Sequence, residues 1–541
     1  MLLSLSCQSD SADIIVHNAV IWTANPQQAK AEAIAIKANR ILAVGNYADL
    51  KNYQGKSTQM IDAEGQFIAP GFIDSHVHMV TAGQNLASVQ LRDAKTKAEF
   101  IQRIKDFAES IPKGSWIIGG DWDHQNWGGE LPAQNWINDV TVDNPVFVVR
   151  LDGHMGLANK LALDLARVDD SVANIEGGEI VRNSKNHLTG IFKDEAMNLI
   201  YNVIPDMNDN EFLRVVNAAG DYLLSNGVTS VQQMGGFNLV ERFEKLNKNQ
   251  QLKVRIYHAV PLSMWEQLAD KIAQGGRGDE WYQIGALKGF VDGSLGSHTA
   301  AFFEPFLDSP GDTGLLVNSM DSIYYWVSHA DKKQLQVAIH AIGDRAINQL
   351  LDVYERVEKE NGAKDRRFRI EHAQHIAPTD FKRFHDLDII ASMQPYHAID
   401  DGRWAEKYIG ERINTTYAFR SLLDAGAKLA FGSDWFVAPP IPLIGIYAAT
   451  TRRTLDDANP DGWVPEQKIS AEESLRAYTI DAAFAAFEEK TKGSLETGKL
   501  ADLVMINQNL LTIDPVKIKD ARIMMTILNG RIVYQSTQEK K

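Results

Sequence analysis

Eight short apolar segments, separated by segments with helical periodicity, are the feature that most constrains the fold of this chain. Each has the length and the β-branched content of a buried strand. Strands that alternate with helices usually pair in parallel, and eight parallel strands close into a barrel. The sequence therefore predicts an α/β fold with a TIM-like (β/α)8 barrel. Its expected strands are 71–76, 227–231, 254–258, 286–290, 337–340, 369–372, 389–393 and 428–434.

Both ends of the chain carry short strand-like segments instead. Asn529-Gly530 is a strong hairpin signal near the C-terminal end. Because chain ends often lie close together, we expect residues 12–68 and 493–537 to form one small β-sandwich domain. The barrel then takes residues 69–492. It contains a long insertion at about 80–222, which we expect to shape the substrate pocket.

Composition narrows the classes of function. Hydrophobic residues make up 44% of the 541 residues and charged residues 23%, as in ordinary folded soluble domains. The net charge of -15 argues against binding to nucleic acid or to an anionic membrane surface. No apolar run is long enough to span a bilayer. These observations favour a small-molecule substrate, no nucleic-acid partner and no membrane-spanning segment.

Cys7 is the one cysteine of the chain. A single cysteine excludes an internal disulfide and a zinc site made of thiolates. The short apolar run that ends at Cys7 resembles the end of a lipoprotein signal, but no basic residue precedes it. We expect a cytoplasmic protein. A periplasmic lipoprotein anchored through Cys7 is the alternative.

Polar residues end several of the predicted strands, at the barrel edge where catalysis takes place. His76 and His78 are two residues apart in an extended segment, so both imidazoles point to one side and can bind one ion. His340 and His372 each end an apolar strand, and Asp434 ends the last one. Each histidine alone is more often a structural residue, and Asp434 has the alternative of a helix N-cap. Together they predict one or two divalent ions, and ligands of this kind suit Zn²⁺ and also Mn²⁺, Fe²⁺, Co²⁺ or Ni²⁺.

Lys288 lies inside an apolar strand. Burial of an ammonium group is costly and lowers its pKa. One interpretation is an ion pair with Asp292 or another carboxylate at a strand end. The other is that the neutral amine captures carbon dioxide, and that the resulting carbamate bridges two cations.

The chain resembles the amidohydrolase superfamily over nearly its whole length. Residues 70–78 resemble the first-strand motif of that superfamily, and residues 493–504 resemble its return into the β-sandwich domain. Residues 151–163, 288–297 and 340–344 are similar to the amidohydrolase-3 branch, which includes N-substituted formamide deformylase. The resemblance implies a TIM barrel with a β-sandwich, zinc or a similar metal, and hydrolysis of non-peptide carbon–nitrogen bonds. It is also compatible with a homodimer.

The resemblance also implies a role for each candidate ligand. It places His76, His78 and Asp434 on the more buried ion, His340 and His372 on the more exposed ion, and Lys288 as the bridge between the two ions.

The expected chemistry is hydrolysis by a metal-bound hydroxide. Asp434 is expected to accept the proton of the hydroxide and to pass it to the leaving nitrogen. His154 is expected to hydrogen-bond the developing oxyanion, and Glu371 and Asp344 to orient imidazoles. One alternative is a mononuclear deaminase or an esterase on the same scaffold, with Lys288 unmodified. Another is a binding protein that retains the barrel without catalysis.

Aromatic residues are frequent in the insertion and near the last strands. We expect one or two tryptophans to line the pocket and the others to pack in cores, the usual role of tryptophan. The candidates are Trp116, Trp122, Trp127, Trp136, Trp404, Trp435 and Trp463.

Overall fold

The computed structural model describes residues 11–150, 153, 155–175 and 178–537. The chain divides into two compact units. The first combines residues 1–79 and 220–541, and the second is Val80–Ala219. Among the described residues, no helix combines the length and the apolar character needed to cross a membrane.

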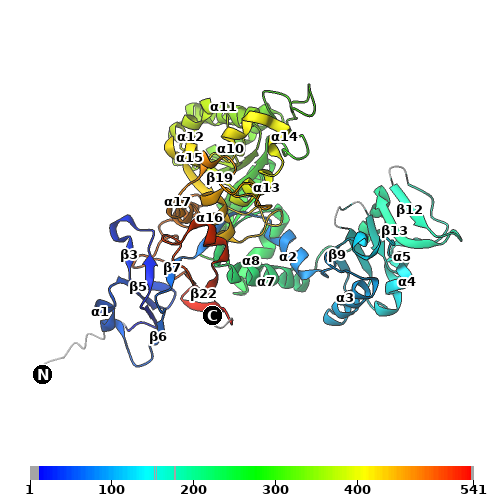
Figure 1. Cartoon of the computed structure of the whole chain (residues 1–541), viewed down its shortest axis with the longest axis horizontal. Coiled ribbons are helices and arrows are strands. Elements are labelled where there is room, and N and C mark those ends of the chain that lie inside the picture. The colour runs from blue at the N-terminus through cyan, green and yellow to red at the C-terminus, as the bar shows by residue number, and fades with distance from the viewer. Residues whose placement is uncertain (1–10, 151–152, 154, 176–177, 538–541) are drawn as a thin grey trace. The chain divides into compact units, whose positions relative to one another are not determined.

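An eight-stranded parallel sheet forms the centre of the first unit (Figure 1). Its strands are neighbours in chain order, and all eight predicted strands are present. They are β8 (Phe72–Val77), β14 (Val228–Met234), β15 (Arg255–Pro261), β16 (Tyr282–Phe290), β17 (Gln336–Ala341), β18 (Arg369–His372), β19 (Ile390–Met393) and β20 (Lys428–Phe431).

The first and last of these strands come together at their carboxyl ends. The N–H of Asp434 donates to the carbonyl of His76 over 2.7 Å, and the N–H of His78 donates to the carbonyl of Trp435 over 2.5 Å. These bonds join β8 to the segment that follows β20, and the sheet is almost closed. The predicted TIM-like barrel is confirmed.

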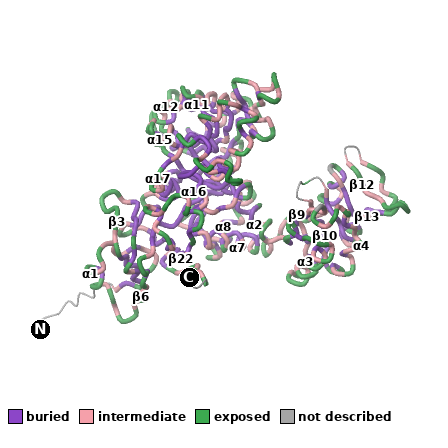
Figure 2. The backbone as a smooth tube through the Cα atoms, in the orientation of Figure 1, coloured by how far each residue is buried: buried purple, intermediate pink, exposed green. Residues whose placement is uncertain are grey.

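Helices between the strands cover the barrel, and their apolar residues face it. In α11 (Asp344–Asn361), the buried residues Ile347, Leu350, Leu351 and Tyr354 recur at spacings of three and four, so they lie on one helix face. Figure 2 shows the buried residues of this unit concentrated in its interior. The barrel core therefore follows from local periodicity combined with packing between neighbouring elements.

Strands from both ends of the chain share one six-stranded sheet. β7 (Phe67–Pro70) pairs antiparallel with β21 (Leu503–Ile506). β22 (Ile523–Leu528) and β23 (Arg531–Gln535) form the expected hairpin, in which Asn529 and Gly530 both have positive φ, as a tight hairpin turn requires. The other two strands are β2 (Val20–Trp22) and β3 (Lys30–Ala31).

A separate four-stranded sheet contains only N-terminal strands: β1 (Ile14–His17), β4 (Ala33–Lys37), β5 (Arg40–Gly45) and β6 (Gln59–Asp62). Buried side chains from the two sheets, among them Ile34 and Ile36 from one and Leu503 and Ile527 from the other, belong to one apolar cluster. A β-sandwich domain with the boundaries 12–68 and 493–537 remains a prediction.

The second unit has its own sheet and its own apolar core. Five strands make the sheet: β9 (Ile117–Trp122), β10 (Val146–Arg150), β11 (Met155–Ala158), β12 (Gly178–Arg182) and β13 (Leu188–Asp194). Phe100 and Ile104 of α3 (Lys97–Ser110) are buried in one core cluster with Trp122 and Val148. This unit therefore holds a core independent of the barrel.

Candidate metal centre

The six residues predicted as metal ligands line one cavity of about 590 Å³ at the carboxyl ends of the barrel strands. Parallel strands bring residues that are distant in sequence to the same edge of a barrel. The residues are His76 at the end of β8, His78 just after it, Lys288 in β16, His340 in β17, His372 at the end of β18 and Asp434 after β20.

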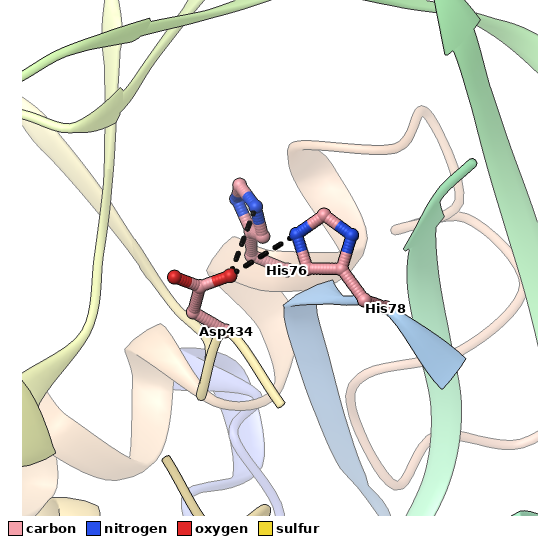
Figure 3. Close-up of side chains that lie close together, drawn as sticks. All are labelled: His76, His78 and Asp434. Carbon is pink, nitrogen blue, oxygen red and sulfur yellow. Dashed lines mark ion pairs between the residues drawn. The ribbon is translucent and has the colours of Figure 1, made fainter. Parts of the chain in front are cut away.

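His76, His78 and Asp434 form the first compact group (Figure 3). Oδ1 of Asp434 lies 3.5 Å from Nε2 of His76 and 3.2 Å from Nε2 of His78. The three side chains offer one ligand atom each, all within 4.8 Å of one another. Two imidazole nitrogens and one carboxylate oxygen in such a group can bind a divalent cation.

A buried polar network orients His76. Its Nδ1 donates to Oε2 of Glu371 over 2.5 Å, which leaves Nε2 facing Asp434. The other oxygen of Glu371 accepts from Nε of Arg369 over 2.7 Å, and Ser392 Oγ donates to Oε2 over 2.8 Å. Burial alone would raise the pKa of Glu371, but the charge of Arg369 and the hydrogen bond from His76 outweigh burial and hold the pKa well below its usual range. Glu371 is therefore an ionised acceptor that fixes the ring of His76.

Burial keeps three of the imidazoles neutral. Desolvation, reinforced by the charge of Lys288, lowers the pKa of His76 to about 4 and that of His340 to about 3. Burial, followed by the proximity of His340, lowers the pKa of His372 well below its usual range. A neutral imidazole retains the lone pair that binds a metal. At neutral pH these imidazoles can therefore bind a metal cation without first losing a proton.

Lys288 lies within the same group of side chains. Its Nζ is 3.2 Å from Nε2 of His76 and 5.0 Å from the centre of the Phe290 ring. Burial lowers the pKa of Lys288 to about 8, against the opposing effect of the negative charges of Glu371 and Asp434. Roughly one tenth of the amine is then neutral at a pH of about 7.

Asp292 does not make the ion pair with Lys288 that was one interpretation of the sequence. Its carboxylate accepts three backbone N–H groups from the loops after β16 and β17, and its Oδ1 lies 3.6 Å from Nε2 of His340. Asp344, which was expected to orient an imidazole, accepts the N–H of Phe303 over 2.9 Å instead. The carboxylate beside His340 is therefore Asp292, because the loops after β16 and β17 meet at this side chain.

A second group of ligand atoms includes a residue that the sequence did not indicate. His372, His397 and Asp434 offer ligand atoms that all lie within 4.8 Å of one another. His397 lies on α13 (Pro395–Asp401), directly after β19. His397 lies four residues beyond the predicted strand 389–393. The prediction considered only residues at or directly after strand ends, so it did not include this histidine.

The rest of the cavity wall is largely apolar. Phe290, Leu295, Trp404 and Phe436 line it. Among the described lining residues, Lys288 is the single Lys or Arg. Of the seven tryptophans considered, Trp404 contributes to this wall, whereas Trp122 is fully buried in the core of the second unit. His154 and Cys7 lie outside the described residues.

This donor set fits a divalent transition-metal ion. Imidazoles and carboxylates are the usual protein ligands of zinc and its neighbours, and Asp434 belongs to both groups of ligand atoms. In the described part of the chain, the buried Nε2 of His397 has no hydrogen-bond partner. Because buried polar atoms are nearly always paired, this nitrogen is consistent with a cation ligand.

Comparison with known proteins agrees with this geometry. Residues 59–534 match the model of the amidohydrolase family. Protein LONG AFTER FAR-RED 3 of Arabidopsis thaliana is 39% identical, over 97% of this chain and 92% of its own length. N-substituted formamide deformylase of Arthrobacter pascens is 26% identical, over 97% of this chain and 99% of its own length.

A solved structure shares the fold along almost the whole length. An uncharacterized metal-dependent hydrolase from Pyrococcus furiosus superposes with a TM-score of 0.76 at 28% identity, over 93% of this chain and all of that one. The family match covers residues 59–534. It agrees with the barrel and with the group of histidines around Asp434. The chain belongs to the amidohydrolase family.

Proposed function

We propose that this protein hydrolyses the carbon–nitrogen bond of an N-substituted formamide, amide or cyclic amide with the help of one or two divalent ions. Membership of the amidohydrolase family makes it a hydrolase of non-peptide carbon–nitrogen bonds. The observation that carries the proposal is the group His76, His78 and Asp434, held within 4.8 Å in a cavity at the catalytic edge of the barrel.

We assign His76, His78 and Asp434 to a first ion, and His340 and His372 to a second ion. Zn²⁺ is the proposed metal, because neutral imidazoles and a carboxylate are its preferred ligands in the absence of thiolates. A bound Zn²⁺ lowers the pKa of water from about 15.7 to about 7 and so supplies a nucleophile at neutral pH.

Lys288 is the proposed bridge between the two ions. Its amine adds to carbon dioxide, a nitrogen–carbon bond forms, and one proton is released, which leaves an anionic carbamate with two oxygens. The position of Nζ, 3.2 Å from His76 and inside the cavity, supports this assignment. The ordinary pKa of a lysine would keep the amine charged and unreactive, and burial reduces that obstacle.

Asp434 is the proposed proton carrier. Burial raises the pKa of Asp434, but the hydrogen bond with His78 and the neighbouring imidazoles outweigh it, so the pKa lies well below its usual range. The carboxylate is therefore ionised at neutral pH, which is the state that can accept the proton of the attacking water. It then delivers this proton to the leaving nitrogen, which cannot depart as an anion. His154 stays the candidate hydrogen-bond donor to the oxyanion.

The cavity wall supports a substrate with an apolar substituent. Trp404, Phe290 and Phe436 offer aromatic surface beside the candidate ligands. A substrate carboxylate would find Lys288 as the one Lys or Arg among the described lining residues, and that amine is assigned to the metals. A neutral, N-substituted amide fits this wall better than an anionic one. The relative named N-substituted formamide deformylase is consistent with this class.

Purified protein should be incubated with an N-benzyl formamide, an N-alkyl formamide, a cyclic amide, an aryl ester and an amidine. We expect release of formate and amine from the N-benzyl formamide, lost after treatment with a chelator and restored by Zn²⁺. Release of ammonia from the amidine alone would replace the proposal with a deaminase. Hydrolysis of the ester alone would replace it with an esterase.

A further inference from the structure

We propose that His397 is a further ligand of the second metal ion, beside His372, and that Asp434 is shared between the two ions. This assignment rests on the proposed function, because it requires that the barrel cavity binds metal. It adds a residue that lies on a helix rather than at a strand end, and that neither the strand-end pattern nor the family resemblance indicated.

The position of His397 is set by the start of α13. Pro395 is the first residue of that helix and follows directly after Gln394. Proline favours the first turn of a helix because its φ is already helical and it has no N–H to satisfy. The turn directs His397 to the cavity, where it lines the same wall as His372 and Asp434.

Three ligand atoms meet at this point. Those of His372, His397 and Asp434 all lie within 4.8 Å of one another, a spacing that small side-chain adjustments around one cation would close. The ring of His372 is held from behind, because its Nδ1 lies 2.8 Å from Oε1 of Gln394. Its Nε2 is thus the atom left for a ligand role.

The nitrogen of His397 differs from that of His340 in what surrounds it. Nε2 of His397 is buried and has no hydrogen-bond partner in the described part of the chain. Nε2 of His340 lies 3.0 Å from the carbonyl oxygen of Gly293 and 3.6 Å from Asp292. The nitrogen of His397 is therefore the one that needs a partner in this structure.

A carboxylate lies on the same helix as His397. Asp401 lies one turn later on α13 and is close enough for its charge to interact with His397. Tyr417 donates its hydroxyl hydrogen to Oδ2 of Asp401 over 2.6 Å, which holds the carboxylate in place. This contact fixes the carboxyl group of Asp401 on the helix that carries His397.

The experiment measures metal ions per chain in the full-length protein, purified without chelator and then titrated with Zn²⁺ and, separately, with Co²⁺. The variants are His397→Phe and His375→Phe. Phenylalanine keeps a ring but removes both nitrogens. His375 is a matched control, because its Nε2 is also buried without a partner in the described residues, yet it belongs to neither group of ligand atoms.

We expect about two ions in the wild type and in His375→Phe, and about one in His397→Phe, or a second ion bound at least about tenfold more weakly. The visible spectrum of the Co²⁺ protein should change in His397→Phe alone. Melting curves check that each variant is folded, and His397→Gln replaces His397→Phe if the latter is not.

Two ions bound with unchanged affinity in His397→Phe would overturn the assignment and leave the proposed function intact. A wild type that binds one ion would also overturn it, since no second site would exist. A wild type that binds no ion at all would instead refute the metal-dependent function itself. The three outcomes are therefore distinguishable.

Discussion

At the scale of single residues, Asp434 has the largest number of proposed roles, as a metal ligand and as the proton carrier. It belongs to both groups of ligand atoms, its carboxylate is ionised, and its backbone lies in the left-handed region at a φ of 59°. Few residues other than glycine adopt this conformation without strain, and Asp and Asn are among them. The position therefore accepts an acidic side chain where most other residues would be disfavoured.

The substitution Asp434→Asn should lower kcat by about 10²- to 10⁴-fold, the usual contribution of a general acid–base group. The fold should persist, because Asn tolerates the same backbone conformation. Turnover of the N-benzyl formamide and the melting temperature give the two readouts. Asp424→Asn, at the end of α15 (Phe419–Asp424), is the matched control. Near-normal turnover in Asp434→Asn would rule out the role as proton carrier.

His258 predicts a pH dependence of stability that is independent of the metal site. The ring is buried, its Nδ1 lies 2.8 Å from the hydroxyl of Tyr282, and burial lowers its pKa to about 3. In the unfolded chain its pKa is about 6.5. Between these values the unfolded state binds one more proton, so stability is fully present above about pH 6.5 and is lost as the pH falls towards 3.

The substitution His258→Gln keeps a hydrogen-bonding group but removes the titration. We expect the melting temperature of this variant to fall less steeply than that of the wild type between pH 6.5 and 4.5. The difference in slope should approach about 1.4 kcal/mol of unfolding free energy per pH unit. Parallel curves for the two proteins would show that His258 does not titrate as the structure indicates.

At the scale of elements, Arg369 ties several barrel strands together. It lies in β18 and donates to the carbonyl of Ser75 in β8 over 2.7 Å and to the hydroxyl of Ser392 in β19 over 2.9 Å. It also contacts Gln232 of β14 and pairs with Glu371. One buried cation thus connects strands that are far apart in sequence and sets the position of the group that orients His76.

The substitution Arg369→Met should destabilise the protein by about 3–5 kcal/mol, because it leaves Glu371 buried without its main counter-charge. Denaturant unfolding measures this loss. The double variant Arg369→Met/Glu371→Gln should recover part of it, since the uncompensated charge is then removed. A double variant no more stable than Arg369→Met would show that packing, and not charge, is the dominant contribution.

At the scale of the whole molecule, the metal-ligand group spans the seam of the barrel. His76 lies near the end of the first strand, His78 directly follows that strand, and Asp434 follows the last one. Two backbone hydrogen bonds join these segments, whereas continuous ladders join the other neighbouring strands. A cation bound here would link the two ends of the barrel at its least bonded point.

Removal of metal should therefore lower the melting temperature and loosen this seam first. A ligand at about 1,000 times its Kd contributes about 4 kcal/mol to stability, and this contribution is lost on chelation. Hydrogen exchange should accelerate in residues 72–78 and 428–435 more than in β15, which carries none of the proposed ligands. Loss of the metal with no change in melting temperature would contradict this coupling, and Zn²⁺ added back should reverse the effect.

Local pattern in the sequence was enough to locate most of the barrel and most of the candidate site. Each barrel strand is a short apolar run, because a strand covered on both faces must be apolar along its length. Each of His76, His340, His372 and Asp434 lies at or just beyond the end of such a run. Parallel strands place their carboxyl ends on one edge of the barrel. The clustering of these residues could therefore be predicted from their positions in the sequence.

Other features depended on contacts between distant segments. Asp292 rather than Asp344 lies beside His340, because loops after neighbouring strands fold over each other. The pairing of β7 with β21 joins residues more than 400 positions apart. His397 lies within reach of Asp434 through the direction of one helix turn after β19. Periodicity encodes which residues are buried, but which individual buried residues contact one another is decided by tertiary packing between segments that are distant in the sequence.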